Sequence, residues 1–274
     1  GNLSRPGGNL IYSLSDRTAR TRRVSRFKFY TPRVARPRHL VRSVLAFFHS
    51  RVQFLPMVHV TYYLEVMSSW CYWAEPAWKE LKERFAGRAV FDWKIALMPP
   101  EAYPVSAAQL EWFYRRSGSI VRSPFMLDSG WFEPELKQYL APNYIALAGR
   151  ELGITDDRVR LALAQAGMRE GKKVGRWEVA IAAAAPAVGL DPARLLARAQ
   201  SPDIAAKAQA TTDEFFALKV SQRPAFLIES SIGDRAVFSG IVRVEPLAAA
   251  IEAALADEAA YGSWKAHFGD PPGI

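Results

Sequence analysis

The chain has 274 residues and a formal net charge of +9, but this charge is distributed unevenly. Residues 1–56 hold 12 basic residues and one acid, a net charge of +11, whereas residues 57–274 hold 24 basic and 26 acidic residues, a net charge of −2. The basic balance therefore gives no reason to expect nucleic-acid binding by the larger part. No run of 18 apolar residues occurs, which excludes a membrane-spanning helix, and the one cysteine excludes an intramolecular disulfide.

Residues 1–56 form a basic leader with several Gly and Pro and no sustained helical or strand period. Such a segment buries too little apolar surface to offset its ordering entropy, so we expect it to be unstructured. Its composition also suits a transit peptide, or a segment that binds nucleic acid or anionic lipid. We favour a third interpretation, in which Met57 is the true start and the native protein lacks the leader.

The next elements predict a βαβ unit. Val58–Val66 is rich in β-branched and aromatic residues with a period of two, which indicates a strand. Apolar residues then recur at steps of three and four up to Phe85, which predicts a helix that Gly87 ends. Alternation over Val90–Leu97 indicates a second strand.

From about Met98 to Leu218 the sequence predicts helices. Ser106 with Gln109 looks like a capping box, Pro134 begins a stretch expected to be helical towards Tyr139, and Thr155–Asp157 caps Val159–Ala166.

The segment Ser68-Ser69-Trp70-Cys71-Tyr72 lies where the first strand gives way to the first helix. A helix amino terminus stabilises a thiolate, so a cysteine there can have a lowered pKa. The position three residues before Cys71 is Ser68, so the segment reads as a Cys-x-x-Cys site that has lost its attacking cysteine. Because the second position lies one turn inside the helix, we expect a mostly buried Cys71 thiol of modest reactivity. The alternative is that Cys71 is simply a small buried hydrophobe.

Other chemistries find little support in the sequence. Four histidines and one cysteine show no metal-ligand spacing, and no phosphate-binding glycine loop is present. A Cys-His pair is also disfavoured, because His59 begins the strand whose far end leads to Cys71.

These residues resemble the DsbA-like branch of the thioredoxin superfamily, in the cluster of FrnE-type oxidoreductases, 2-hydroxychromene-2-carboxylate isomerases and kappa-class glutathione transferases. Trp70-Cys71-Tyr72 matches the FrnE motif, Ser68 matches the kappa-class serine, and Pro224 looks like the cis-proline. The resemblance spans residues 57–274. It implies an α/β thioredoxin fold with an all-helical insertion at about residues 100–218, followed by two further strands over Val220–Ile228 and Arg235–Gly240.

The resemblance also implies a site and a cofactor. Ser68 and Cys71 would be the catalytic residues, and Ser68 would hydrogen-bond the thiolate of glutathione. Cofactor-binding positions are Ser68, Trp70, Arg223, Pro224, Ser239 and Gly240. Arg223 could bind an anionic group, or could be a solvated loop arginine.

Three functional hypotheses follow. The first is a glutathione-dependent isomerase or transferase that acts on a small hydrophobic electrophile. The second is a single-cysteine oxidoreductase in which Cys71 forms mixed disulfides with a thiol substrate, and the third is a thioredoxin-like binding module without redox activity. We expect a cytoplasmic protein with no nucleic-acid or membrane partner, and the resemblance leaves room for a homodimer.

Overall fold

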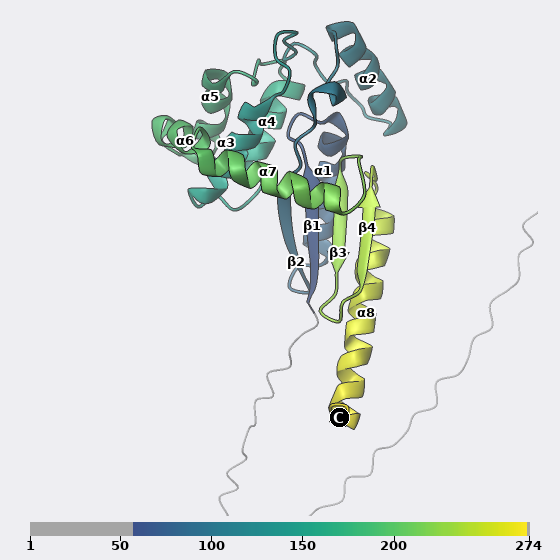
Figure 1. Cartoon of the computed structure of the whole chain (residues 1–274). Coiled ribbons are helices and arrows are strands. Elements are labelled where there is room, and N and C mark those ends of the chain that lie inside the picture. Colours follow the sequence, from purple (N-terminus) through teal and green to yellow (C-terminus); the bar gives the residue numbers. More distant parts are fainter. Residues whose placement is uncertain (1–56, 273–274) are drawn as a thin grey trace, which may run out of the picture. The chain divides into compact units, whose positions relative to one another are not determined.

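A computed structural model describes residues 57–272, and the predictions made for residues 1–56 lie outside this range. Four strands form one sheet in the order β2-β1-β3-β4 (Figure 1). Their bounds are β1 Val58–Leu64, β2 Ala89–Ile95, β3 Ala225–Glu229 and β4 Arg235–Ser239. β2 runs parallel to β1, while the pairs β1–β3 and β3–β4 are antiparallel. All four predicted strands are therefore confirmed, with bounds that differ by one to five residues.

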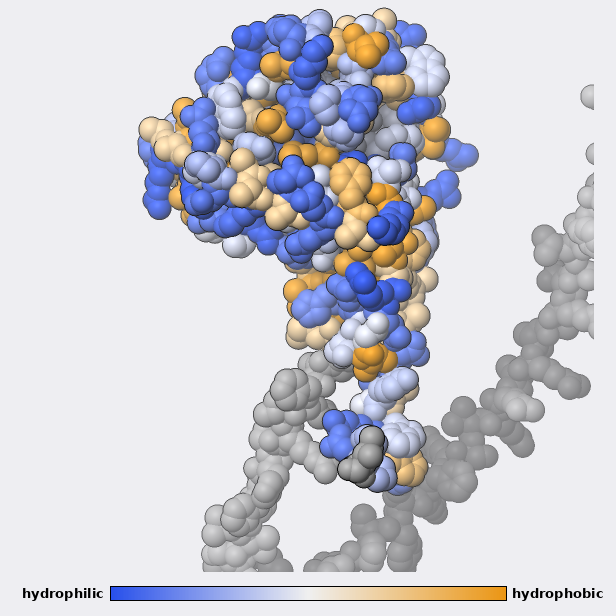
Figure 2. All heavy atoms as spheres, in the orientation of Figure 1, coloured by the Kyte–Doolittle hydropathy of each residue, from blue (hydrophilic) through white to orange (hydrophobic). Residues whose placement is uncertain are grey.

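The two faces of the sheet are covered by different helices. Alternate residues of β1, among them Tyr62, join the large core with α1 (Ser69–Arg84) and α8 (Val244–Phe268). On the other face Tyr63 packs with Phe215 of α7 (Pro202–Ala217). In Figure 1, α7 crosses only one end of this second face. Figure 2, in the same orientation, shows apolar residues on the surface over the sheet, beside α7.

The connection from β2 to β3 is helical, and this agrees with the predicted fold class. It contains a 3-10 turn at Pro100–Ala102 and the helices α2 Ala107–Ile120, α3 Leu140–Glu151, α4 Arg158–Met168, α5 Trp177–Val188, α6 Pro192–Ala199 and α7. Ser106 caps α2 as expected, since its Oγ accepts the Gln109 N–H at 3.2 Å. The Gln109 side chain accepts the N–H of Val105, one residue before the cap, at 2.7 Å, so the reciprocal bond of a capping box is shifted by one residue.

The helix expected from Pro134 towards Tyr139 is wrong. Residues 134–139 form a turn at Pro134–Glu135 and a bend at Lys137, and α3 begins only at Leu140. The Tyr139 hydroxyl contacts both the N–H and the carbonyl of Glu133, at 2.8 and 3.2 Å. These bonds fold the segment back on itself, so that it does not extend as a helix.

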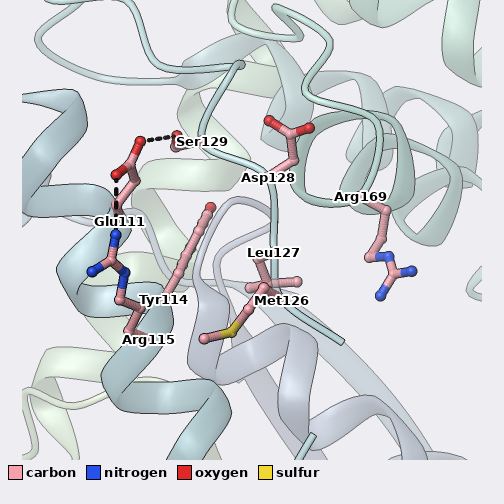
Figure 3. A pocket seen from close by; sticks show the side chains of 8 residues that line it. All are labelled: Glu111, Tyr114, Arg115, Met126, Leu127, Asp128, Ser129 and Arg169. Atoms are coloured by element: carbon pink, nitrogen blue, oxygen red, sulfur yellow. Dashed lines mark hydrogen bonds and ion pairs between the residues drawn. The ribbon is translucent and has the colours of Figure 1, made fainter. Parts of the chain in front are cut away.

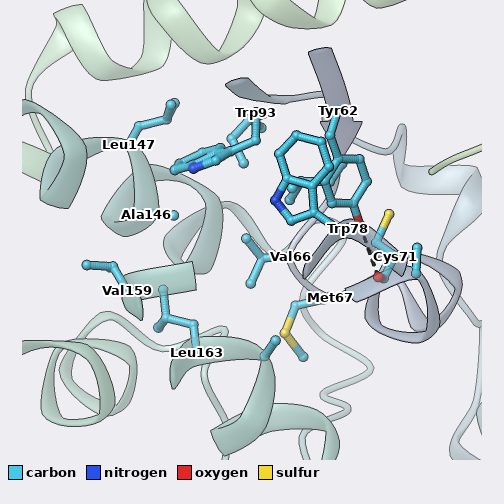
Figure 4. Close-up of a cluster of buried hydrophobic side chains, with 14 of the residues drawn as sticks. Tyr62, Val66, Met67, Cys71, Trp78, Trp93, Ala146, Leu147, Val159 and Leu163 are labelled. Atoms are coloured by element: carbon cyan, nitrogen blue, oxygen red, sulfur yellow. Dashed lines mark hydrogen bonds between the residues drawn. The ribbon is translucent and has the colours of Figure 1, made fainter. Parts of the chain in front are cut away.

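One continuous core joins the sheet to the inserted helices. Figure 4 shows Tyr62, Trp78 and Cys71 close to residues of α3 and α4 such as Ala146 and Leu163. Within residues 57–272, no helix combines the length and apolarity needed to cross a bilayer, and no cluster of metal-ligating side chains was found.

Candidate functional site

Ser68 ends the loop after β1 and caps α1. Its backbone is extended (φ −80°, ψ 120°), and its Oγ accepts the Cys71 N–H at 3.4 Å. A serine at this position satisfies one of the amide donors that a helix start leaves unpaired. Accepting this bond through a lone pair turns the hydroxyl proton away from the amide, where it can meet another acceptor.

A buried polar cluster holds the loop in front of Ser68. Glu65 is fully buried and accepts hydrogen bonds from the Met67 N–H (2.8 Å), the Tyr103 hydroxyl (2.9 Å) and the Asn143 amide (2.6 Å). Asn143 also accepts the Val66 N–H at 3.1 Å. Burial raises the pKa of Glu65, and the bonds from Asn143 and Tyr103 oppose that rise. The loop is thus fixed from both the sheet and α3.

Cys71 is 3% exposed, which agrees with the expectation of a mostly buried thiol. Burial raises its pKa from 9.0 to about 12, whereas the Ser68 hydroxyl lowers it by less. A lowered pKa, the usual effect of a helix amino terminus, is therefore not found here. Desolvation outweighs the helix dipole because the sulfur lies inside the first turn and not at its open end.

The Arg223–Pro224 peptide bond is cis, as the resemblance implied for Pro224. Arg223 is buried, so the alternative of a solvated loop arginine is wrong. Its Nε donates to the Ala96 carbonyl at 2.5 Å, and one Nη donates to the Leu97 carbonyl at 2.6 Å. The other Nη donates to the carbonyl of Ser221, two residues earlier. The guanidinium carbon lies 4.3 Å from the centre of the Phe215 ring. Anion binding by Arg223 stays a prediction. Three N–H groups of its guanidinium already donate to protein carbonyls, which leaves fewer donors for an anion.

Ser239 and Gly240 lie at the end of β4 behind this segment. The Ser239 hydroxyl donates to the Gln222 carbonyl at 2.9 Å, and the Gly240 N–H donates to the Pro224 carbonyl at 2.8 Å. Gly240 has φ 74°, a conformation that glycine adopts at little cost. Both residues support the backbone around Pro224. Neither of them lines the cavity beside Ser68.

A cavity of about 300 Å³ opens beside Ser68 and Trp70. We call it the Ser68 cavity. Its walls come from the start of α1, the loop after β2, helix α2, Trp131 and the segment before Pro224. The lining residues are Met67, Ser68, Ser69, Trp70, Met98, Ala102, Tyr103, Pro104, Leu110, Phe113, Tyr114, Arg116, Trp131, Ser221, Gln222 and Arg223.

The cavity brings together some of the predicted residues and adds others. Ser68, Trp70 and Arg223 line it, whereas Cys71 lies below it in the core. The aromatic residues and Arg116 of the inserted helices were not predicted as site residues. Their position depends on how the insertion packs over the sheet, and no local pattern encodes that packing. A larger hollow of about 1030 Å³ lies between α1 and the first half of α4, and Ser68 does not line it.

The DSBA-like thioredoxin domain model matches residues 59–252. The chain belongs to this family. No curated protein matches the sequence.

Solved structures share the fold of this DSBA-like protein at low sequence identity. The cytosolic disulfide reductase DsbM from Pseudomonas aeruginosa is 16% identical with a TM-score of 0.59, over 72% of this chain and 98% of its own. A putative protein disulfide isomerase from Nitrosomonas europaea is 16% identical with a TM-score of 0.55, over 78% and 99%. A 2-hydroxychromene-2-carboxylate isomerase is 16% identical with a TM-score of 0.52, over 74% and 98%. These similarities establish the fold.

Proposed function

We propose that this protein is a glutathione-dependent isomerase or transferase in which Ser68 positions the glutathione thiolate. The observation that carries the proposal is the pairing of a Ser68 hydroxyl at the cavity with a Cys71 thiol that is buried and protonated at neutral pH. A serine in the first position cannot form a disulfide with Cys71. Because the Cys71 thiol is buried, we assign the attacking sulfur to a second molecule, glutathione.

The chemistry assigned to Ser68 follows from its place at the start of α1. Its hydroxyl donates to the incoming sulfur, and the positive end of the helix dipole lowers the free energy of the thiolate relative to the thiol. The thiolate then forms a C–S bond with an electrophilic carbon. In transfer, the leaving group departs with its electron pair; in isomerisation, the C–S bond later breaks and the thiolate is regenerated.

The cavity offers groups that suit glutathione. The segment Ser221–Arg223 forms one wall, and the backbone next to Pro224 would pair with the backbone of the tripeptide in the manner of an added strand. One neighbour of the same fold, DsbM from Pseudomonas aeruginosa, has a solved structure with GSH. DsbM is also described as cytosolic, and a cytoplasmic location is part of our proposal.

The test compares substitutions at Ser68. Ser68→Ala removes a charge-assisted hydrogen bond of about 1.5–3 kcal/mol, so we expect glutathione-dependent turnover to fall roughly ten- to hundredfold. Ser68→Cys should form a disulfide with Cys71 and gain measurable disulfide reductase activity. Ser69→Ala, one position along the same wall, is the matched control.

Two outcomes would contradict these assignments. If Ser68→Ala keeps full glutathione-dependent turnover, Ser68 does not position the glutathione thiolate. Rapid alkylation of Cys71 in the native protein, together with loss of activity in Cys71→Ala, would favour the single-cysteine oxidoreductase. Calorimetric titration with glutathione tests binding directly, without a chosen electrophile.

A further inference from the structure

The hollow of about 1030 Å³ between α1 and α4, which we call the α1–α4 hollow, has an apolar and largely aromatic lining. Trp73 of α1 and Phe125, in the loop after α2, line it with their ring centres 5.5 Å apart. Leu161 lines it from α4. Phe125 and Leu161 are 37% and 36% exposed, so both keep apolar surface that a ligand can cover. The volume lies at the upper end of the range for small-molecule sites, about 300–1,000 Å³.

The aromatic wall of the hollow is held in place from behind. The Trp73 Nε1 donates to the Ser117 Oγ at 3.1 Å, and the guanidinium carbon of Arg169 lies 3.4 Å from the centre of the Phe125 ring. Arg169 lines a separate hollow of about 380 Å³, where its side chain points away from Asp128 (Figure 3). Because the two rings are already fixed, a ligand that lies against them loses little free energy in ordering side chains.

The charged side chains that line the α1–α4 hollow all have partners of opposite charge. The pairs are Lys79 with Glu83 at 3.8 Å, Arg158 with Asp156 at 2.7 Å, Lys82 with Asp157, and Glu75 with Arg160. A charged ligand would therefore lose its hydration without gaining a free counter-charge, and the hollow favours an uncharged one.

A proline inside α1 adds a hydrogen-bond acceptor to this apolar lining. Pro76 lies in the interior of the helix and lines the hollow, as does Tyr72, four residues earlier. Proline has no N–H, so the Tyr72 carbonyl lacks the donor that an α-helix normally supplies at this position. A helical carbonyl points along the axis towards the residue four positions ahead, which here is Pro76. The free acceptor therefore lies at the α1 side of the hollow.

Gln165 supplies donors from the opposite helix. The Tyr72 hydroxyl donates to the Gln165 Oε1 at 3.3 Å, a bond that links α1 to α4 at the hollow. The oxygen of the Gln165 amide is thereby used, and its N–H groups can donate to a ligand. The hollow thus combines an apolar lining with an acceptor on one helix and a donor on the other.

We propose that the α1–α4 hollow is a second binding site, for a flat, uncharged aromatic ligand that carries an amide-like N–H and carbonyl, as in a lactam. The N–H donates to the Tyr72 carbonyl, the ligand carbonyl accepts from the Gln165 amide, and the ring lies against Trp73 and Phe125. The site is separate from the Ser68 cavity and does not depend on the proposed function.

Two probes that differ in one donor test the inference: 2-quinolinone, and 1-methyl-2-quinolinone, which has no N–H. In calorimetric titration we expect the native protein to bind 2-quinolinone about fivefold more tightly, the value of one hydrogen bond. Pro76→Ala restores the N–H that bonds the Tyr72 carbonyl within the helix, so this preference should disappear while α1 is retained. Pro186→Ala is the matched control, because Pro186 lies inside α5, outside the lining of the hollow, and the preference should persist.

A second variant tests where the probes bind. Leu161→Gln places an amide on the apolar lining and should weaken both probes about fivefold, whereas saturating glutathione should leave their affinities unchanged. The inference is overturned if 2-quinolinone shows no binding at about 1 mM, or if Pro76→Ala keeps the preference. It is also overturned if glutathione displaces the probes and Leu161→Gln does not weaken them, since they would then occupy the Ser68 cavity.

Discussion

The Cys71 sulfur lies one turn inside α1, and the Ser68 hydroxyl stands between the start of that helix and solvent. The Tyr62 hydroxyl donates to the Cys71 carbonyl at 3.0 Å and the Tyr62 ring stacks on Phe226, so Cys71 is held in the packed core (Figure 4). The carboxylates of Glu65 and Glu75 lie near enough to raise the pKa of the thiol further. At the residue scale, the chemistry of the site is therefore divided. Ser68 faces the cavity, and Cys71 belongs to the core.

Alkylation of Cys71 should be slow at neutral pH and should accelerate at alkaline pH. Burial raises its pKa from 9.0 to about 12, so the thiolate fraction at neutral pH is about a thousandfold smaller than for an ordinary thiol. Iodoacetamide labelling followed by mass spectrometry measures this, with the urea-unfolded protein as the control. Equal labelling rates in the folded and unfolded protein would contradict the burial of the thiol.

Arg223 should contribute strongly to stability. Arg223→Ala leaves the Ala96 and Leu97 carbonyls without their donors and removes the stacking on Phe215, so we expect the free energy of unfolding to fall by about 2–4 kcal/mol. Arg223→Lys should recover part of this loss. Urea unfolding followed by circular dichroism measures both, and a change below about 0.5 kcal/mol for Arg223→Ala would refute the role.

A local pattern pointed to Ser68, because a helix start can be read within a few residues, and the family resemblance pointed to the cis-proline Pro224. The partners of Arg223 could not be found in that way, since Ala96 and Leu97 lie more than 120 residues earlier in the chain. Arg116 was missed for a related reason. Nothing in its own helix shows that α2 faces Ser68, and that arrangement follows from packing of the whole insertion.

At the scale of elements, a buried charge cluster joins α1 to α4. Arg160 of α4 is 3% exposed and contacts Glu75 of α1 and Asp157 at the start of its own helix. Asp157 in turn contacts Lys82 of α1. Burial acts to lower the pKa of Arg160, and the attraction of Glu75 and Asp157 outweighs it, so the pKa is raised. The cluster fixes the inserted helices against the helix that carries Ser68.

Breaking this cluster from one side should be costly. Arg160→Met leaves two largely buried carboxylates with fewer partners, so we expect a loss of about 3–5 kcal/mol in the free energy of unfolding. The double variant Arg160→Met with Glu75→Gln also removes one of those carboxylate charges, so its free energy of unfolding should fall by less. Chemical denaturation of both variants checks the order, and a double variant less stable than Arg160→Met would show that charge burial is not the cause.

At the scale of the whole molecule, the sheet and the insertion share one core. The family and the four strands along the chain could be predicted, because the first two strands have a local period and the resemblance implied the other two after a helical stretch. The turns at residues 134–139 could not, because the hydroxyl that closes them comes from the buried Tyr139. The sequence at Pro134 favoured a helix, but the hydrogen bonds between Tyr139 and Glu133 hold this segment in a non-helical conformation.

The Glu65–Asn143 contact has a consequence for hydrogen exchange. The amide protons of Val66 and Met67 lie in a loop, yet both are donated to buried side chains that join the sheet to α3. They can exchange with solvent only when that junction opens, so we expect them to exchange as slowly as amides in the middle of β1. Amide exchange followed by NMR tests this. In Asn143→Ala the Val66 amide should exchange at least tenfold faster, and these two loop amides would then serve as reporters of the separation of sheet and helices.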